Sequence, residues 1–166
     1  MAKLDVKIHE SAGATTRVFQ VAAGAVGTIL AGEPVKYTSD GSPYVIKLAT
    51  GDPETGTDLF VGIAATNSTD KVAVDGEVEV LMPVPGRTLL KCAPTTASNA
   101  NTQAEINALV GDAVAFDLTD GVFTIDEDEG NDDNVHGLII EGGSATEGVL
   151  YFSVKSSVMK QGSILA

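Results

Sequence analysis

A degenerate internal repeat constrains the fold of this chain more than any other feature. Residues 32–46 read GEPVKYTSDGSPYVI and residues 111–125 read GDAVAFDLTDGVFTI, so two segments share apolar positions on either side of an Asp-Gly pair. Apolar residues that alternate with polar ones indicate a strand with one buried face. An Asp-Gly pair between two such runs is a strong hairpin signal. Each copy therefore predicts a strand, a turn and a second strand.

The similarity between the copies continues beyond the hairpins. Residues 61–63 (VGI) correspond to residues 136–138 (HGL), and the alternating segment that starts at Gly76 corresponds to one that starts at Gly148. A repeated set of supersecondary units predicts a repeated fold. We expect an all-β protein of two related small β-barrel or sandwich units from this repeat, packed as one compact body.

One short helix is expected between the two units. Thr102, followed three residues later by Glu105, has the pattern of a capping box, and Gly111 is placed to end the helix. The segment before it is rich in Ser, Thr, Asn and Ala, which is typical of a linker. The expected organisation is a first β unit with an N-terminal arm at 1–91, a linker and a short helix near 102–110 within 92–110, and a second β unit at 111–166.

The composition excludes several classes of protein. A chain of 166 residues buries enough surface to need no covalent staple, and its single Cys92 cannot close an intramolecular disulfide. The chain has 10 Lys and Arg against 23 Asp and Glu, a net charge of −13, which argues against nucleic acid and anionic membranes as partners. Residues 92–154 contain 12 acidic residues and no Lys or Arg, so we expect one strongly negative region.

The apolar segments favour a protein made in the cytoplasm. The first residues, MAKLDVK, lack the apolar core of a signal peptide. The most apolar segment, 18–31, is interrupted by polar residues and glycine and is shorter than a bilayer span of about 20 residues. We therefore interpret it as a buried strand and turn.

The motifs of common enzymes do not occur in this sequence. There is no nucleophile elbow, P-loop or dinucleotide-binding glycine motif, and His9 and His136 lack the spacing of a metal-binding helix. The acidic run 126–134 departs from the calcium-loop template, so a solvated loop is the favoured interpretation and weak divalent binding the alternative. We expect a protein that is not an enzyme, with no catalytic residues, no cofactor and no metal site.

The N-terminus has two interpretations. Apolar residues alternate with charged ones over the segment made of Lys3, Leu4, Asp5, Val6, Lys7 and Ile8, which is compatible with a strand. The first interpretation is a strand within the sheet of the domain itself. The second is an arm that adds a strand to the edge of a partner's sheet. A domain with many short strands also has exposed edges, which favours a symmetric oligomer.

The second half of the chain resembles the decoration proteins of tailed bacteriophages, which are also called cement or head-stabilising proteins. The resemblance is carried by GDAVAFD at 111–117, by the strand GLI at 137–139 and by the closing strand GVLYFSVK at 148–155. It implies a virion protein that binds the outer surface of an icosahedral head and bridges capsid subunits. The implied partners are the major capsid protein and the chain itself, as a homotrimer. It also implies that residues 2–9 serve as the capsid-binding arm.

Two other functions remain open at this stage. A carbohydrate-binding or adhesin β-module of a virion fibre or surface appendage is the main alternative, although such sites use aromatic platforms and the chain has no Trp. A small trimeric β-enzyme that hydrolyses nucleotides is the other, and it requires a set of ordered carboxylates with a phosphate-binding motif.

Overall fold

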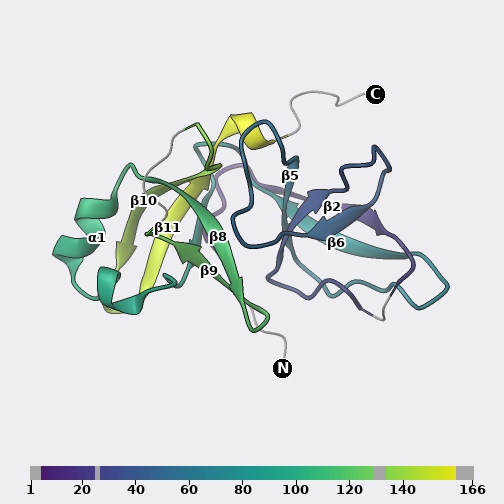
Figure 1. The fold of residues 1–166 in the computed structure, drawn as a ribbon, viewed down its shortest axis with the longest axis horizontal. Coiled ribbons are helices and arrows are strands. Elements are labelled where there is room, and N and C mark those ends of the chain that lie inside the picture. Colours follow the sequence, from purple (N-terminus) through teal and green to yellow (C-terminus); the bar gives the residue numbers. More distant parts are fainter. Residues whose placement is uncertain (1–4, 25–26, 129–133, 160–166) are drawn as a thin grey trace.

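The computed structural model describes residues 5–24, 27–128 and 134–159, and these form two β-sheets side by side (Figure 1). The five-stranded sheet has the order β2 (Thr15–Val21), β6 (Gly76–Met82), β5 (Phe60–Ala64), β3 (Pro34–Tyr37) and β4 (Val45–Lys47). The six-stranded sheet has the order β1 (Lys7–Glu10), β7 (Leu89–Cys92), β11 (Val149–Val154), β10 (Leu138–Ser144), β8 (Ala113–Thr119) and β9 (Val122–Asp126). The all-β prediction is confirmed. Over the described residues the sheets stay open, in a sandwich-like arrangement, rather than closing into barrels.

The two sheets repeat the same topology. Strands β6, β5, β3 and β4 are neighbours in that order, and β11, β10, β8 and β9 repeat the order in the second copy. The repeat also includes the strand before each hairpin, because β2 flanks β6 as β7 flanks β11. Gln20 of β2 forms a parallel bridge with Tyr44, and Pro94, which follows β7, forms one with Ile125 of β9. Each sheet therefore curls, so that the end of β2 reaches the start of β4 in one sheet and the end of β7 reaches β9 in the other, through a single bridge in each case.

The turn signals of the two hairpins act differently. Asp120 and Gly121 both have positive φ, 52° and 75°, which is the backbone of the tight turn favoured by the twist of antiparallel strands. In the first copy the loop is longer, and the carboxylate of Asp40 accepts a hydrogen bond from the backbone N–H of Ser42 at 2.9 Å. Both predicted hairpins are present, with β3 pairing β4 and β8 pairing β9.

The helix forms where the capping box predicts it. Helix α1 (Gln103–Leu109) begins after Thr102, whose hydroxyl accepts a bond from the N–H of Glu105, while the Glu105 carboxylate accepts one from the N–H of Thr102 at 2.9 Å. It follows a short 3-10 helix, η1 (Ala97–Ala100), and a second one, η2 (Ser156–Val158), follows β11. Ile106 is fully buried and fixes α1 against the six-stranded sheet. No helix within the described ranges is long and apolar enough to span a membrane.

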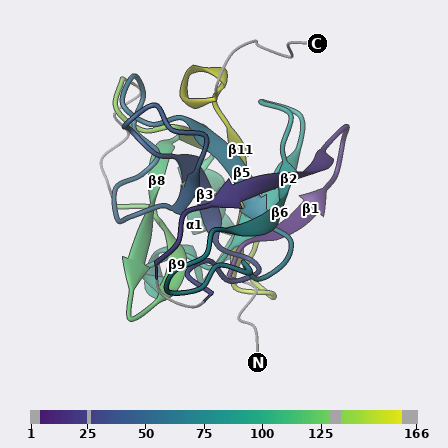
Figure 2. The ribbon, with the colours of Figure 1, turned by 90° about the vertical axis from the view of Figure 1, so that its right-hand side faces the viewer.

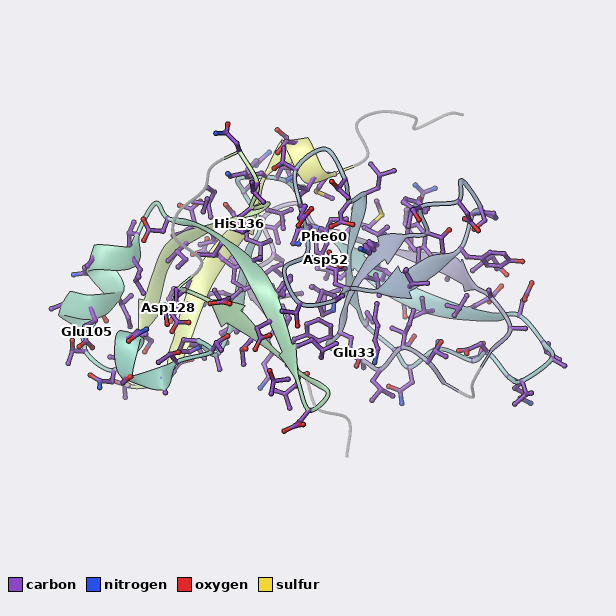
Figure 3. All side chains as sticks on the ribbon, viewed as in Figure 1. Glu33, Asp52, Phe60, Glu105, Asp128 and His136 are labelled. Atoms are coloured by element: carbon purple, nitrogen blue, oxygen red, sulfur yellow. The ribbon has the colours of Figure 1, made fainter. Side chains whose placement is uncertain are left out.

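The larger of two apolar clusters is shared by both units. The larger apolar cluster lies under the six-stranded sheet, where Phe116 makes edge-to-face contacts with Phe123 and Phe152. Phe60 of the first unit is 1% exposed and belongs to the same cluster, and Figure 3 shows it where the units meet. A smaller cluster, rich in Val, fills the five-stranded sheet. Burial of the large apolar side chains at the junction holds the two units together.

Backbone hydrogen bonds also cross the junction. Phe116 donates its N–H to the carbonyl of Asp52 and accepts the N–H of Gly51 at its own carbonyl, both at 2.8 Å. The loop between β4 and β5 therefore pairs with β8 of the second unit like a short additional strand. This connection explains why the two units form one body.

The two sheets do not divide the chain strictly in sequence order. Strand β1 and all of β7 except Cys92 fall within the range 1–91 expected for the first unit, yet both strands belong to the six-stranded sheet with the strands of the second copy. The apolar segment 18–31 differs in part from the expected buried strand and turn. It begins within β2, an edge strand in which Val18 is 61% exposed, and only its later residues, such as Val21 and Ile29, enter the core.

Candidate functional site

The N-terminal strand lies at the outer edge of the six-stranded sheet. Strand β1 runs antiparallel to β7, with Lys7 opposite Lys91 and Ile8 opposite Leu90, and the register shifts before Glu10. All four of its residues are exposed. It is thus a strand of the chain's own sheet, as the first of the two interpretations expects. Of the other residues in the candidate arm, Lys3 and Leu4 lie outside the described residues.

The start of the arm is attached to both units. The carboxylate of Asp5 accepts a hydrogen bond from the N–H of Phe123 at 3.0 Å, in the second unit. The N–H of Val6 donates to the carbonyl of Gly32 at 3.1 Å, in the first unit, and the Val6 side chain is 2% exposed. These contacts fix the direction in which β1 begins, and they join partners up to 118 residues apart in sequence.

One face of β1 carries polar and aromatic groups. Lys91 on β7 forms a salt bridge with Glu147 at 2.8 Å, which raises the pKa of the lysine and lowers the pKa of the carboxyl. The ring of His9 stacks on Tyr151 with ring centres 3.7 Å apart. Lys7 lies beside the salt bridge, on a hollow of about 460 Å³. This face therefore carries two lysines, Lys7 and Lys91, with the negative charge of Glu147 beside them.

The same hollow contains the only cysteine of the chain. Cys92 is 2% exposed, and burial raises the pKa of its thiol to about 12. Its Sγ donates to the carbonyl of Phe123 at 3.2 Å. A thiol with so high a pKa stays protonated at neutral pH and is therefore a poor nucleophile.

The opposite face of β1 is apolar. Val6 and Ile8 line a groove of about 230 Å³ against Ile63 and Leu81 of the first unit. Ile8 is 41% exposed, so the groove opens to solvent beside the strand edge. A strand edge flanked by an apolar groove on one face and by positive side chains on the other is suited to binding an extended polypeptide.

A cluster of three charged side chains joins β3 to the loop between β4 and β5. The Lys36 ammonium contacts Asp52 at 2.7 Å and Asp58 at 2.6 Å, and both carboxyls are mostly buried. Burial raises the pKa of Asp52. Burial also opposes ionisation of Asp58, but the N–H of Glu54 and the Lys36 ammonium outweigh it and lower the pKa of that carboxyl. The cluster fixes the loop that pairs with β8, so its geometry serves folding.

The described part of the acidic run and His136 make contacts that hold the fold together. Residues 129–133 of the run lie outside the described residues. Glu127 accepts hydrogen bonds from the N–H groups of Thr95 and Thr96, which ties the run to the start of η1. His136 is 6% exposed, and its backbone forms an isolated antiparallel β-bridge with Glu54. Within the ranges that the structure describes, no three His, Cys, Asp or Glu side chains are grouped to hold a metal ion.

The comparisons with known proteins leave the function to be argued from the residues. No protein-family model matches this sequence, and no curated protein is similar enough to count as a match. The exposed edge of β1, with its two contrasting faces, is therefore the candidate functional site. The alternation of apolar and charged residues at the N-terminus predicts a strand here, and the structure adds its place at the edge of the six-stranded sheet.

Proposed function

We propose that the protein is a bacteriophage decoration protein that binds the outside of an icosahedral head and bridges neighbouring capsid subunits. The sequence resemblance of its second half suggests this role. The observation that carries the proposal is the edge strand β1, which is exposed along all four residues and lies between an apolar groove and the Lys7–Lys91 pair. Such an edge suits attachment to the sheet of a neighbouring protein.

The charge distribution supports the same role. The chain carries a net charge of −13, and residues 92–154 contribute 12 acidic residues without a compensating Lys or Arg. An acidic outer surface stays hydrated and repels other acidic surfaces, which suits a protein displayed in many copies. The positive residues at β1 are then the part of the molecule that faces the shell. Many modest contacts of this kind on one lattice combine into stable attachment.

The test uses expanded heads that lack the protein. Heads are mixed with the wild-type chain, with Lys7→Glu and with Lys71→Glu, and bound protein is measured after sedimentation. Lys71 is an exposed lysine in the turn before β6, so it controls for the change in net charge. We expect saturable binding of the wild type and of Lys71→Glu, and weaker binding of Lys7→Glu. Absence of saturable wild-type binding contradicts the proposal, whereas equal binding of all three contradicts only the role of β1.

The oligomeric state is a separate part of the proposal. Local three-fold axes of a head suit a homotrimer, and the exposed strand edges provide surfaces through which copies can associate. Light scattering during gel filtration measures the mass of the free protein in solution. The same measurement is made on protein released from decorated heads. A trimer in either setting agrees with the proposal, and a strict monomer in both contradicts the trimeric part of it.

A carbohydrate-binding module is the second candidate, and one observation favours it. The stacked His9 and Tyr151 rings lie on the face of β1, and aromatic faces are the usual platforms for sugar rings. Each ring covers one face of the other, which reduces the area left for a sugar. A glycan array separates the two candidates, because specific glycan signals that vanish with Tyr151→Ala support the module, and their absence leaves the decoration role.

A further inference from the structure

The register of the sheets makes β2 the counterpart of β7. Val80 of β6 and Phe152 of β11 are equivalent in the repeat, and both are fully buried. Arg17 of β2 pairs with Val80, and Leu90 of β7 pairs with Phe152. By the same register Thr16 corresponds to Leu89 and Val18 to Lys91.

The two counterparts differ in what covers their outer sides. In the six-stranded sheet, β1 pairs with β7 at Leu89, Leu90 and Lys91. In the five-stranded sheet, β2 is the last strand, and none of the described residues forms a ladder with its outer side before the single bridge at Gln20. We call the outer side of β2 from Thr15 to Phe19 the open edge. Figure 2, which turns the five-stranded sheet toward the viewer, shows β2 at the front.

The side chains along the open edge are exposed, as expected for a strand that has no neighbour on its outer side. Residues 15–18 are all exposed, and Val18 is 61% exposed. Their counterparts under β1 are less accessible, since Leu90 is 0% exposed and Leu89 and Lys91 are intermediate. An edge strand with unpaired N–H and C=O groups and an exposed β-branched side chain is a template for another strand.

We propose that the open edge accepts an extended segment of a partner protein, which adds antiparallel to β2 in the position that β1 takes on β7. This proposal concerns a different edge from that of β1, and it does not depend on the capsid role. The occupant resembles β1 itself, with a Lys or Arg opposite Val18 and an apolar residue opposite Arg17, as in the pairs Lys7–Lys91 and Ile8–Leu90.

The charges beside the open edge suit such a segment. Glu79 lies opposite Val18 on β6, and Glu77 lies opposite Gln20, with both glutamates exposed on the same face. A lysine on the incoming strand, placed beside Val18, extends over this face toward Glu79. An apolar residue opposite Arg17 packs on the aliphatic part of the arginine side chain. An acidic segment is repelled, which gives the edge selectivity.

The experiment captures a peptide by disulfide exchange. The probe is a synthetic peptide of residues 5–12 of this chain in which Glu10 is replaced by cysteine, because Glu10 pairs with Leu89, the counterpart of Thr16. The receiving protein is the Thr16→Cys variant of the full chain, kept in a redox buffer with excess small thiol. The native Cys92 is buried and does not compete. The Val72→Cys variant is the matched control, since Val72 is 75% exposed and lies in a turn.

The expected result is capture by Thr16→Cys at least about tenfold above capture by Val72→Cys, because strand pairing raises the local concentration of the peptide thiol. A peptide that also carries Ile8→Pro, which cannot complete the ladder, is expected to lose this advantage, and Glu79→Lys in the protein is expected to reduce it. Equal capture at the two cysteines overturns the proposal, and so does an unchanged advantage with the proline peptide. Preferential disulfide dimerisation of Thr16→Cys without peptide also overturns it, because the open edge is then taken by a second copy.

Discussion

Removing the charge of Lys36 is expected to cost far more stability than removing the charge of another lysine on the same hairpin. The Lys36 ammonium contacts the carboxyls of Asp52 and Asp58, and the three side chains are 19%, 13% and 6% exposed. Lys36→Met keeps the aliphatic part of the side chain but leaves two mostly buried carboxylates without their cation. Deletion of one partner of a buried ion pair costs about 3–5 kcal/mol. Because Lys36 keeps some exposure to solvent, we expect a loss of free energy of unfolding at the lower end of this range, about 3 kcal/mol.

The dependence on pH provides a second measure of the same effect. In the wild type the lowered pKa of Asp58 means that its contribution is present above the unfolded pKa and is lost as the pH falls through the folded pKa. In Lys36→Met the carboxyls are buried without a cation, so their folded pKa values are expected to rise above the unfolded ones. The folded variant then binds protons more strongly than the unfolded chain. Its stability deficit therefore shrinks as the pH falls from about 7 to about 5.

The assay is urea unfolding followed by far-UV circular dichroism, at both pH values. Lys47→Met is the matched control, because Lys47 is 44% exposed and its Nζ lies 3.8 Å from the buried Glu33 carboxylate, which also accepts the N–H of Leu30 at 2.8 Å. The longer contact of a more exposed lysine is expected to contribute about 1 kcal/mol. A loss in Lys36→Met no larger than that in Lys47→Met refutes the reasoning. A deficit that stays constant or grows as the pH falls refutes the assignment of the loss to the two carboxyls.

Two further predictions concern a repeated glycine and the single thiol. Gly76→Ala is expected to destabilise the chain by several times more than Gly148→Ala in the same urea assay, because a Cβ at Gly76 collides with the backbone of Asp70, whereas Gly148 faces open space and has only the mild strain of φ = 65°. Equal losses contradict this explanation. A thiol reagent at pH 8 is expected to leave native Cys92 unmodified and to react within seconds once urea unfolds the chain, and rapid modification of the native protein contradicts its burial.

Much of the fold follows from local signals in the sequence. The Asp-Gly pairs, the alternation of apolar residues and the capping box of Thr102 each depend on residues a few positions apart, and the structure confirms the elements that they predict. The repeat also predicts that Gly76 and Gly148 occupy equivalent positions. Their reasons differ, since one avoids a clash and the other adopts a left-handed turn, and sequence alone does not separate these two roles.

The sheet positions of β1, β2 and β7 do not follow from local signals. Residues 15–21 (TTRVFQV) and 89–92 (LLKC) share no recognisable pattern, although they are topological counterparts. Strand preference depends on the neighbours that a strand meets, and those neighbours are distant in sequence. The placement of β1 depends on contacts such as the one between Asp5 and Phe123. An alternating N-terminal segment therefore predicts a strand but not the edge that it joins.

The open edge follows from duplication combined with a single N-terminal arm. A repeated sheet has two equivalent outer strands, and among the described residues one strand, β1, covers one of them. The short turn at 11–14 leads directly from β1 on one sheet into β2 on the other, so β1 cannot lie along both. An exposed edge with Val18 at its centre normally promotes self-association. In this chain Glu77 and Glu79 lie beside that edge, within a molecule of net charge −13. These charges oppose the pairing of two copies edge to edge along β2, whereas a strand that carries a positive side chain is attracted.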